Sequence, residues 1–169
     1  MERYCILVAD GTRARFFVYK ERVWEWGEPR PRLTEQADLV NPEHALAGVD
    51  VYREARSSAH PANSSGHHTA YDDHRDDNRR EGRRRFARRV VDRLGEVAKG
   101  ARAEHLVVCA GPELMGVLRP ELDRGLHPRL RVEEVTRDWT QLSTEDLQGH
   151  LVREGILRDP GPPPDQLSA

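Results

Sequence analysis

The clearest pattern of apolar and polar positions lies between residues 72 and 99. Phe86, Val90, Leu94 and Val97 recur there at spacings of four, four and three residues, which is the pattern of an amphipathic helix. Upstream of Phe86, no residue of this run can pack into a core. The pattern therefore predicts one long helix that is anchored in the domain at one end only.

An antiparallel hairpin is predicted at the start of the chain. Tyr4 to Ala9 is apolar and rich in β-forming residues, Asp10-Gly11 is a turn signal, and Arg13 to Tyr19 follows as a second strand. Arginines alternate with apolar residues in this second strand, so we expect one face to carry Arg13 and Arg15 and the other to be buried. Further strands are expected through Val23, Trp24 and Trp26 and through Leu33 to Val40.

Strand and helix patterns alternate in the second half of the chain. The expected elements are a buried strand at His105–Ala110, a helix at Glu113–Leu126 with a kink or break at Pro120, a strand at Val132–Val135, and a final helix opened by a capping box at Ser143–Asp146. This order predicts an α/β domain whose mixed sheet begins with an antiparallel hairpin and has helices packed on it.

The 169 residues suffice for one domain with a sizeable core. We expect this domain to span residues 1–157, with a mobile irregular segment at about 43–71 and a disordered Pro-rich tail at 158–169. No internal repeat is present.

Charge narrows the possible partners. The formal net charge of −2 excludes a generally basic coat, so contacts with RNA or other phosphates would have to be local. Arginines cluster in the long helix at positions 79, 80, 83, 84, 85, 88 and 89. Acidic residues stand three or four positions from them, as in Glu81 with Arg85 and Arg88 with Asp92, so a self-neutralised solvated face and a binding face are both open. Gly82, a poor residue inside a helix, favours the binding face.

Cofactor and metal motifs are absent from the sequence. Cys5 and Cys109 lie in apolar strand-like runs without a C-x-x-C partner, which argues against a zinc or redox site. The histidines at 60, 67, 68 and 74 match no metal-ligand spacing, so no metal and no cofactor are predicted. No catalytic constellation is recognisable either. An apolar run of membrane-spanning length and a secretory leader are also missing, which predicts a cytoplasmic protein without membrane insertion.

Several segments together resemble the bacterial host attachment protein family. They are YCILVADGTRARFFVYK at 4–20, RRRFARRVVDRLGEVAK at 83–99, HLVVCAGPELMGVLRPEL at 105–122 and TQLSTEDLQGHL at 140–151. That family is in turn similar to the central domain of eukaryotic and archaeal peptide-chain release factor one and of Pelota. The resemblance implies a ribonuclease H-like α/β fold.

Release factors carry Gly-Gly-Gln in the loop before the corresponding helix, where it promotes hydrolysis of peptidyl-tRNA. Here the loop reads HPANSSGHHTAYDDH, and no glutamine occurs between Gln36 and Gln141. The resemblance therefore implies a non-catalytic protein associated with the ribosome, tRNA or ribosomal RNA, for example in ribosome rescue or dormancy. The residues expected to bind RNA are His67, His68, Arg75, Arg79, Arg80, Arg83 and Arg84.

Two alternatives to this function stay open. One is a protein-interaction module linked to host attachment or envelope physiology, in which the same helix binds an acidic protein. The other is a metal-dependent hydrolase that uses the His-rich loop.

Overall fold

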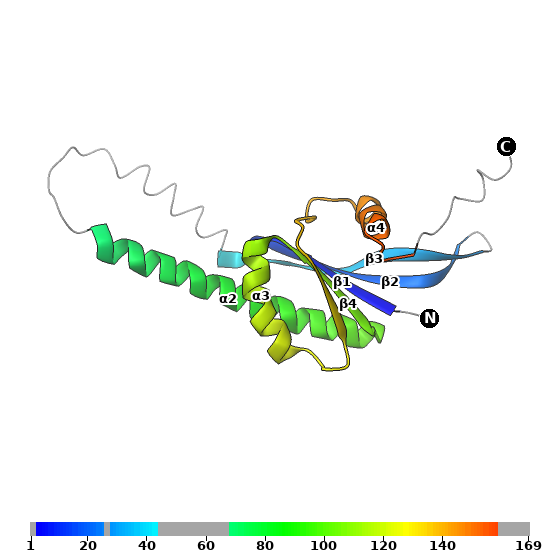
Figure 1. Cartoon of the computed structure of the whole chain (residues 1–169), viewed down its shortest axis with the longest axis horizontal. Coiled ribbons are helices and arrows are strands. Elements are labelled where there is room, and N and C mark those ends of the chain that lie inside the picture. Colours follow the sequence, from blue (N-terminus) through cyan, green and yellow to red (C-terminus); the bar gives the residue numbers. More distant parts are fainter. Residues whose placement is uncertain (1–2, 26–27, 44–67, 159–169) are drawn as a thin grey trace.

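The computed structural model describes residues 3–25, 28–43 and 68–158. Within these residues it contains five strands and three helices (Figure 1). The strands are β1 (Arg3–Ala9), β2 (Arg13–Glu25), β3 (Glu28–Val40), β4 (His105–Ala110) and β5 (Arg131–Val135), and the helices are α2 (His68–Ala101), α3 (Pro112–Gly125) and α4 (Thr144–Arg153). The expected α/β class with a mixed sheet is confirmed.

The five strands form one open sheet in the order β3-β2-β1-β4-β5. β1, β2 and β3 pair antiparallel, whereas β4 pairs in parallel with both β1 and β5. Neighbouring parallel strands need a crossover connection, and α2 and α3 lie in these two crossovers. The predicted turn of the leading hairpin is closed by Asp10, whose Oδ1 accepts hydrogen bonds from the N–H groups of Thr12 and Arg13 at 2.7 and 2.8 Å.

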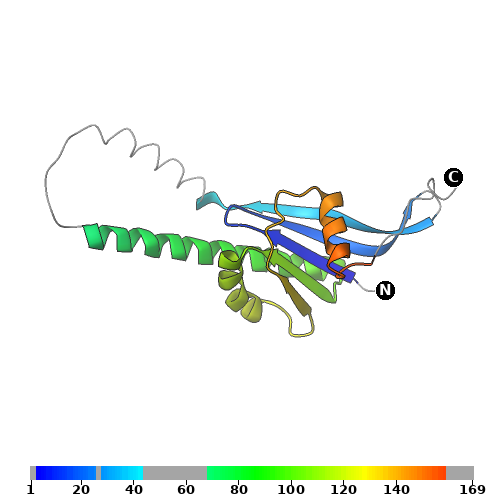
Figure 2. The same ribbon diagram turned by 45° about the horizontal axis from the view of Figure 1, so that its top comes forward.

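Both faces of the sheet are covered. α2 and α3 pack on one face and α4 lies on the other (Figures 1 and 2). Side chains of β1 alternate between the two layers, with Cys5 and Leu7 facing α2 and α3 and Ile6 and Val8 facing α4. A central strand that is buried on both faces requires a continuous apolar run, which explains the sequence CILVA.

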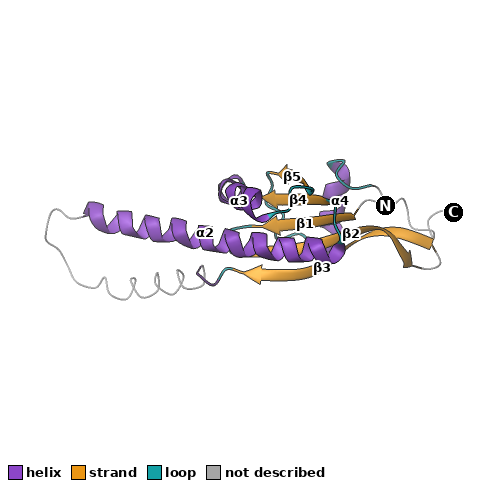
Figure 3. Cartoon of the chain, turned by 90° about the horizontal axis from the view of Figure 1, so that it is seen from below, coloured by secondary structure: helices purple, strands orange, loops and turns teal. Residues whose placement is uncertain are grey.

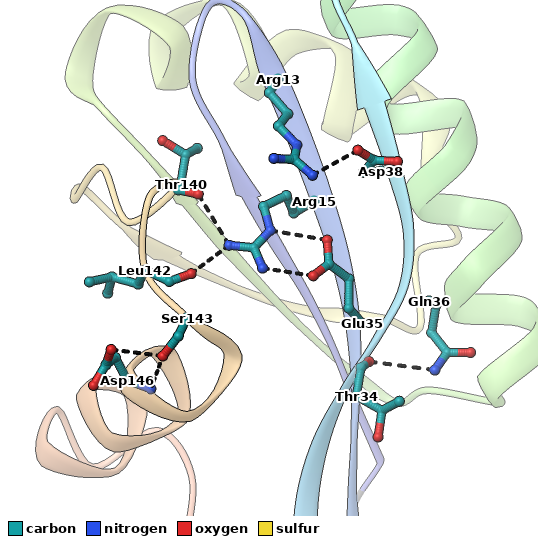
Figure 4. A network of polar contacts seen from close by, with 10 residues as sticks. All are labelled: Arg13, Arg15, Thr34, Glu35, Gln36, Asp38, Thr140, Leu142, Ser143 and Asp146. Atoms are coloured by element: carbon teal, nitrogen blue, oxygen red, sulfur yellow. Dashed lines mark hydrogen bonds and ion pairs between the residues drawn. The ribbon is translucent and has the colours of Figure 1, made fainter.

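The expectation that only one face of β2 is buried is wrong. Arg15 is only 8% exposed because α4 and the segment before it cover its face of the sheet. Its guanidinium binds the carboxylate of Glu35 through two hydrogen bonds of 3.0 and 2.7 Å (Figure 4). It also donates to the main-chain carbonyls of Thr140 and Leu142 at 3.1 and 2.6 Å. Arg15 thereby ties the hairpin to the connection that leads into α4.

The strand expected at Leu33–Val40 is confirmed as part of β3, which begins earlier, at Glu28, and ends at Val40. The strand expected through Val23, Trp24 and Trp26 is not a separate strand. Val23 and Trp24 continue β2 and pair with Arg30 and Pro29 of β3. The pairing of β2 with β3 has two irregularities of register, one after Phe16 with the extra residue in β3 and one after Lys20 with the extra residue in β2. No turn signal separates residues 19 and 23, so the chain has no local reason to begin a new strand. Trp26 lies outside the described residues.

α2 has 34 residues, which corresponds to a length of about 50 Å. It begins at His68 and not at 72, so the last part of the irregular segment expected at 43–71 is helical. The remainder of that segment lies mostly outside the described residues. From Phe86 onward the helix buries one face against the sheet. Its first part extends past the ends of the strands (Figure 3), so the predicted anchoring at one end is confirmed.

α3 and α4 end the described fold. Pro120 does not break α3, which runs on to Gly125. Pro120 and Gly116 both lie on the exposed side of the helix, where the carbonyl freed by the proline is open to water. The predicted start of α4 is confirmed with Ser143 as its N-cap, because Oγ of Ser143 accepts a hydrogen bond of 3.1 Å from the N–H of Asp146. The Asp146 carboxylate accepts a hydrogen bond of 2.7 Å from the Ser143 hydroxyl, in place of the main-chain N–H that it would bind in a capping box.

None of the helices in the described ranges is long and apolar enough to cross a membrane. The Pro-rich tail falls outside the described residues, except for Arg158.

Candidate functional site

Six of the seven residues expected to bind RNA belong to the backbone of α2, which begins at His68. His67 lies outside the described residues, and of His68 and Arg75 only the helical backbone is described. Arg79 and Arg80 are exposed and precede Phe86, at which the packed face of α2 begins. Arg83 and Arg84 lie where the helix reaches the body of the domain. RNA binding by these histidines and arginines therefore stays a prediction.

Pairing within α2 differs from the expectation. Glu81 approaches Arg84 at 3.9 Å, whereas the expected partner, Arg85, binds Glu43 through a hydrogen bond of 2.9 Å. This hydrogen bond is the largest cause that raises the pKa of Arg85. Arg83 pairs with Glu113, the second residue of α3. Acidic residues of neighbouring elements therefore neutralise some of the arginines of α2. The spacing of charges along one helix does not reveal such partners.

Three arginines converge on a groove between α2 and α3. Arg84 and Arg88 stand one helical turn apart on α2, and Arg124 faces them from the last turn of α3. The groove has a volume of about 400 Å³ and is open to solvent. Its remaining lining residues, all from α3, are Gly116, Val117, Pro120 and Glu121.

Glu121 is the only acidic residue that lines this groove. One oxygen of its carboxylate, Oε1, lies 3.5 Å from Nε of Arg88 and 3.0 Å from Nη1 of Arg124. The Glu121 side chain is 11% exposed, whereas those of Arg88 and Arg124 are 54% and 68% exposed. One carboxylate therefore serves two guanidiniums, and most of the donor groups of both remain accessible to a ligand.

The local packing explains why the groove forms. Leu94 and Val91 of α2 and Leu118 and Leu122 of α3 are buried in one cluster, which brings the two helices together. Gly125 permits a close approach, since a Cβ built on it would lie 2.8 Å from Cγ1 of Val91. The polar sides of both helices then meet along the rim of the apolar contact.

Sequence reasoning found Arg84 and missed the rest of the groove. The spacing along α2 pairs Arg88 with Asp92, whereas in the structure Arg88 lies beside Glu121. The sequence patterns above do not point to Arg124 or Glu121. Their spacing of three residues on a predicted helix that follows a parallel strand was an available signal, because such a helix packs beside the preceding crossover helix.

Clusters of metal ligands and reactive thiols are the other candidates for a functional site. Across residues 3–25, 28–43 and 68–158, no three His, Cys, Asp or Glu side chains are arranged to hold a metal ion. His60, His67, His68 and His74 belong to the part whose side chains are not described. Burial raises the pKa of the Cys5 and Cys109 thiols to about 12, so neither is an activated nucleophile. The groove can hold an anion, and no described group beside it is set up to transform one.

Comparison with protein families gives one finding. The model of a family described as "protein required for attachment to host cells" matches residues 5–151, which include the whole groove. A comparison with curated proteins finds no match.

Proposed function

Because the chain belongs to the family of proteins required for attachment to host cells, we propose that it serves attachment as a protein-interaction module. Its contact surface is the groove between α2 and α3, extended by the exposed Arg79 and Arg80. The partner is a protein with an acidic segment. The observation that carries this proposal is the convergence of Arg84, Arg88 and Arg124 on one concave surface with a single carboxylate among them.

Guanidinium chemistry supports a protein partner. Arginine is enriched at protein interfaces and binds carboxylates through two parallel hydrogen bonds. An acidic segment seated on these side chains would be drawn in by charge, even though the chain as a whole has a net charge of −2. The groove is the natural centre of such a contact because it is hollowed and surrounded by further exposed arginines.

The test compares two variants of equal charge in cells that encode the chain. Arg84→Gln with Arg88→Gln alters the groove, whereas Arg89→Gln with Arg93→Gln removes two exposed arginines that do not line it. We expect the groove variant to reduce both attachment to host cells and the recovery of one crosslinked protein partner. The control variant should retain both. Equal attachment by the two variants at equal protein levels would refute the proposal.

A second candidate is an RNA contact by the same helix. It is favoured by the exposed row Arg80, Arg84 and Arg88, in which successive guanidiniums stand one helical turn apart, as contacts along a phosphate backbone would require. The proposed likeness to the central domain of release factor one and Pelota, with its ribonuclease H-like fold, points the same way. Recovery of the crosslinked partner after nuclease treatment separates the two candidates, because only an RNA or ribosome contact is lost.

The proposal includes a cytoplasmic location and a single domain over residues 1–157. From the cytoplasm the chain would act on the attachment machinery of its own cell and not on the host surface. Fractionation of cells, followed by detection of the intact chain, tests the location independently of binding.

A further inference from the structure

The groove binds an anionic group of its own, the carboxylate of Glu121. Arg88 and Arg124 approach the same oxygen of Glu121 from two different helices, at 3.5 and 3.0 Å. Arg84, whose side chain is 61% exposed, lines the groove and does not contact Glu121. Its acidic neighbour Glu81 is 3.9 Å away and itself 45% exposed, so that pair contributes little. An anion that enters the groove would therefore meet three guanidiniums. The Glu121 carboxylate engages only some of the N–H groups of Arg88 and Arg124.

The net charge of the residues that line the groove indicates which ligand charge complements it. Three guanidiniums against one carboxylate leave two positive charges on the lining residues. A phosphorylated serine or threonine carries about −1.5 to −2 at neutral pH, which matches that surplus. A single carboxylate of a ligand would balance only one of these two positive charges. It would also have to compete with Glu121, which belongs to α3 and is always present beside the arginines. Arginine clusters are the usual receptors for phosphorylated side chains.

The shape of the groove favours a peptide over a nucleic acid. The part of the lining contributed by Gly116, Val117 and Pro120 offers apolar contact beside the arginines. A volume of about 400 Å³ is at the lower end of the range of small-ligand sites, which run from roughly 300 to 1,000 Å³. That volume accommodates a phosphate group and one adjacent apolar side chain, whereas a nucleic-acid strand would present a sugar and a second phosphate to the apolar part.

We propose that the groove between α2 and α3 binds a phosphorylated serine or threonine of the partner protein through Arg84, Arg88 and Arg124, with Glu121 as an internal counterion that sets the affinity. The inference rests on the proposed function and adds the modification that controls it. Attachment would then respond to a kinase and a phosphatase acting on the partner.

The experiment measures binding by fluorescence anisotropy with the purified full chain. The probes are a labelled peptide Gly-Leu-pSer-Pro-Ala, the same peptide with glutamate in place of phosphoserine, and a labelled single-stranded RNA. We expect the phosphopeptide to bind at least about tenfold more tightly than the glutamate peptide, because it makes additional charge-assisted hydrogen bonds. Inorganic phosphate in excess should displace it.

Matched variants assign the binding to the groove. Arg84→Gln or Arg124→Gln should weaken phosphopeptide binding about tenfold, and Arg89→Gln, which removes the same charge outside the groove, should leave it unchanged. Glu121→Gln should strengthen binding several-fold, because it releases Arg88 and Arg124 from their shared carboxylate. Circular dichroism checks that each variant is folded. Arg84→Gln perturbs the packing least, because the Arg84 side chain is 61% exposed and its acidic neighbour Glu81 lies 3.9 Å away.

Each outcome decides a different point. Equal binding of the glutamate peptide and the phosphopeptide, with loss in Arg84→Gln, would overturn the phosphate inference and leave the acidic-partner proposal intact. Tighter binding of RNA through the same arginines would overturn both in favour of a nucleic-acid contact. Phosphopeptide binding that Arg89→Gln weakens as much as Arg84→Gln would show a diffuse charge effect and would also overturn the inference.

Discussion

The carboxylate of Glu43 lies in the space that a side chain on Gly82 would occupy. A Cβ built at position 82 would overlap Oε2 of Glu43, while the other oxygen of this carboxylate accepts a hydrogen bond of 2.9 Å from Arg85. The poor helix former in the middle of α2 therefore has a structural explanation. It admits an ion pair that joins the chain just after β3 to the long helix.

Replacing Gly82 by alanine should nevertheless leave the protein as stable or slightly more stable. Alanine gains up to about 1 kcal/mol of helix propensity. The ion pair that it disturbs, between Glu43 and Arg85, is exposed, so solvent screens it and it contributes little to stability. The overlapping atom is the far end of a flexible side chain, which can turn away. Urea unfolding of Gly82→Ala measures the balance, and a loss above about 2 kcal/mol would mean that Glu43 is held more firmly than its exposure suggests.

Gly125→Ala should destabilise the protein, in contrast to Gly82→Ala. The new methyl group would meet Cγ1 of Val91, a stiff β-branched side chain that is 2% exposed in the core. Overpacking of this kind costs about 1 to 3 kcal/mol. Gly95→Ala is the matched control, because nothing lies within 4 Å of its Cβ and the helix propensity should make it stabilising. Equal thermal midpoints for the two variants would contradict this account of the α2–α3 contact.

Breaking the pair between Arg15 and Glu35 should be among the costliest polar substitutions in the described part of the chain. Glu35→Gln leaves the guanidinium of Arg15, which is 8% exposed, without its countercharge. We expect a loss of about 2 to 3 kcal/mol, below the value for a fully buried pair because the Glu35 side chain is 31% exposed. Arg15→Lys should not restore stability, since an ammonium cannot bind Glu35 through two parallel bonds and also reach the carbonyls of Thr140 and Leu142. Chemical denaturation of each variant checks these values, with Arg13→Gln as the exposed control.

The carboxyl of Asp10 should give the protein an acid-sensitive contribution to stability. Burial raises its pKa, but hydrogen bonds from Thr12, Arg13 and Thr140 together outweigh burial and lower the pKa below the usual value of 3.8. A lowered pKa means that the contribution is present above pH 4 and is lost as the pH falls through the folded-state pKa. Asp10→Asn should therefore cost stability at pH 7 and progressively less toward pH 3. A cost that is independent of pH would exclude the charge of Asp10 as its cause.

Loss of the N-terminal cap of α4 should weaken the layer that covers Arg15. Ser143→Ala removes the acceptor for the N–H of Asp146 and should cost about 1 kcal/mol. Ser143→Asp, which supplies another good cap, should restore most of it. The free energy of unfolding in urea provides the comparison, and an unchanged value for Ser143→Ala would show that water replaces the cap at no cost.

Local patterns predicted much of the fold. The spacing of Phe86, Val90 and Leu94 identified the packed face of α2, and the apolar runs at the start of the chain and at His105–Ala110 identified the central strands. Such signals are local, because burial of one face imposes a period on the sequence. The burial of Arg15 beneath α4 was not predictable in this way, since the residues that cover it lie more than a hundred positions away.

The candidate site was predictable only in part for the same reason. The arginine cluster on α2 was visible as composition, but its partners Glu43, Glu113 and Glu121 come from other elements. An arginine at helical spacing from an acidic residue looks the same in the sequence whether it pairs with that residue or faces a groove. Only the approach of α3 separates Arg84 and Arg88 from their neighbours Arg85 and Arg89.

The two cysteines have a practical consequence. Cys5 and Cys109 lie on adjacent strands but belong to opposite layers of the core, and each is fully shielded from solvent. Alkylating reagents added to the folded protein should therefore label neither of them. A cysteine introduced at position 89, which is exposed beside the groove residue Arg88 but does not line the groove, would then be the sole reactive thiol among the described residues. A fluorophore attached there would report occupancy of the groove without any need to remove the native cysteines.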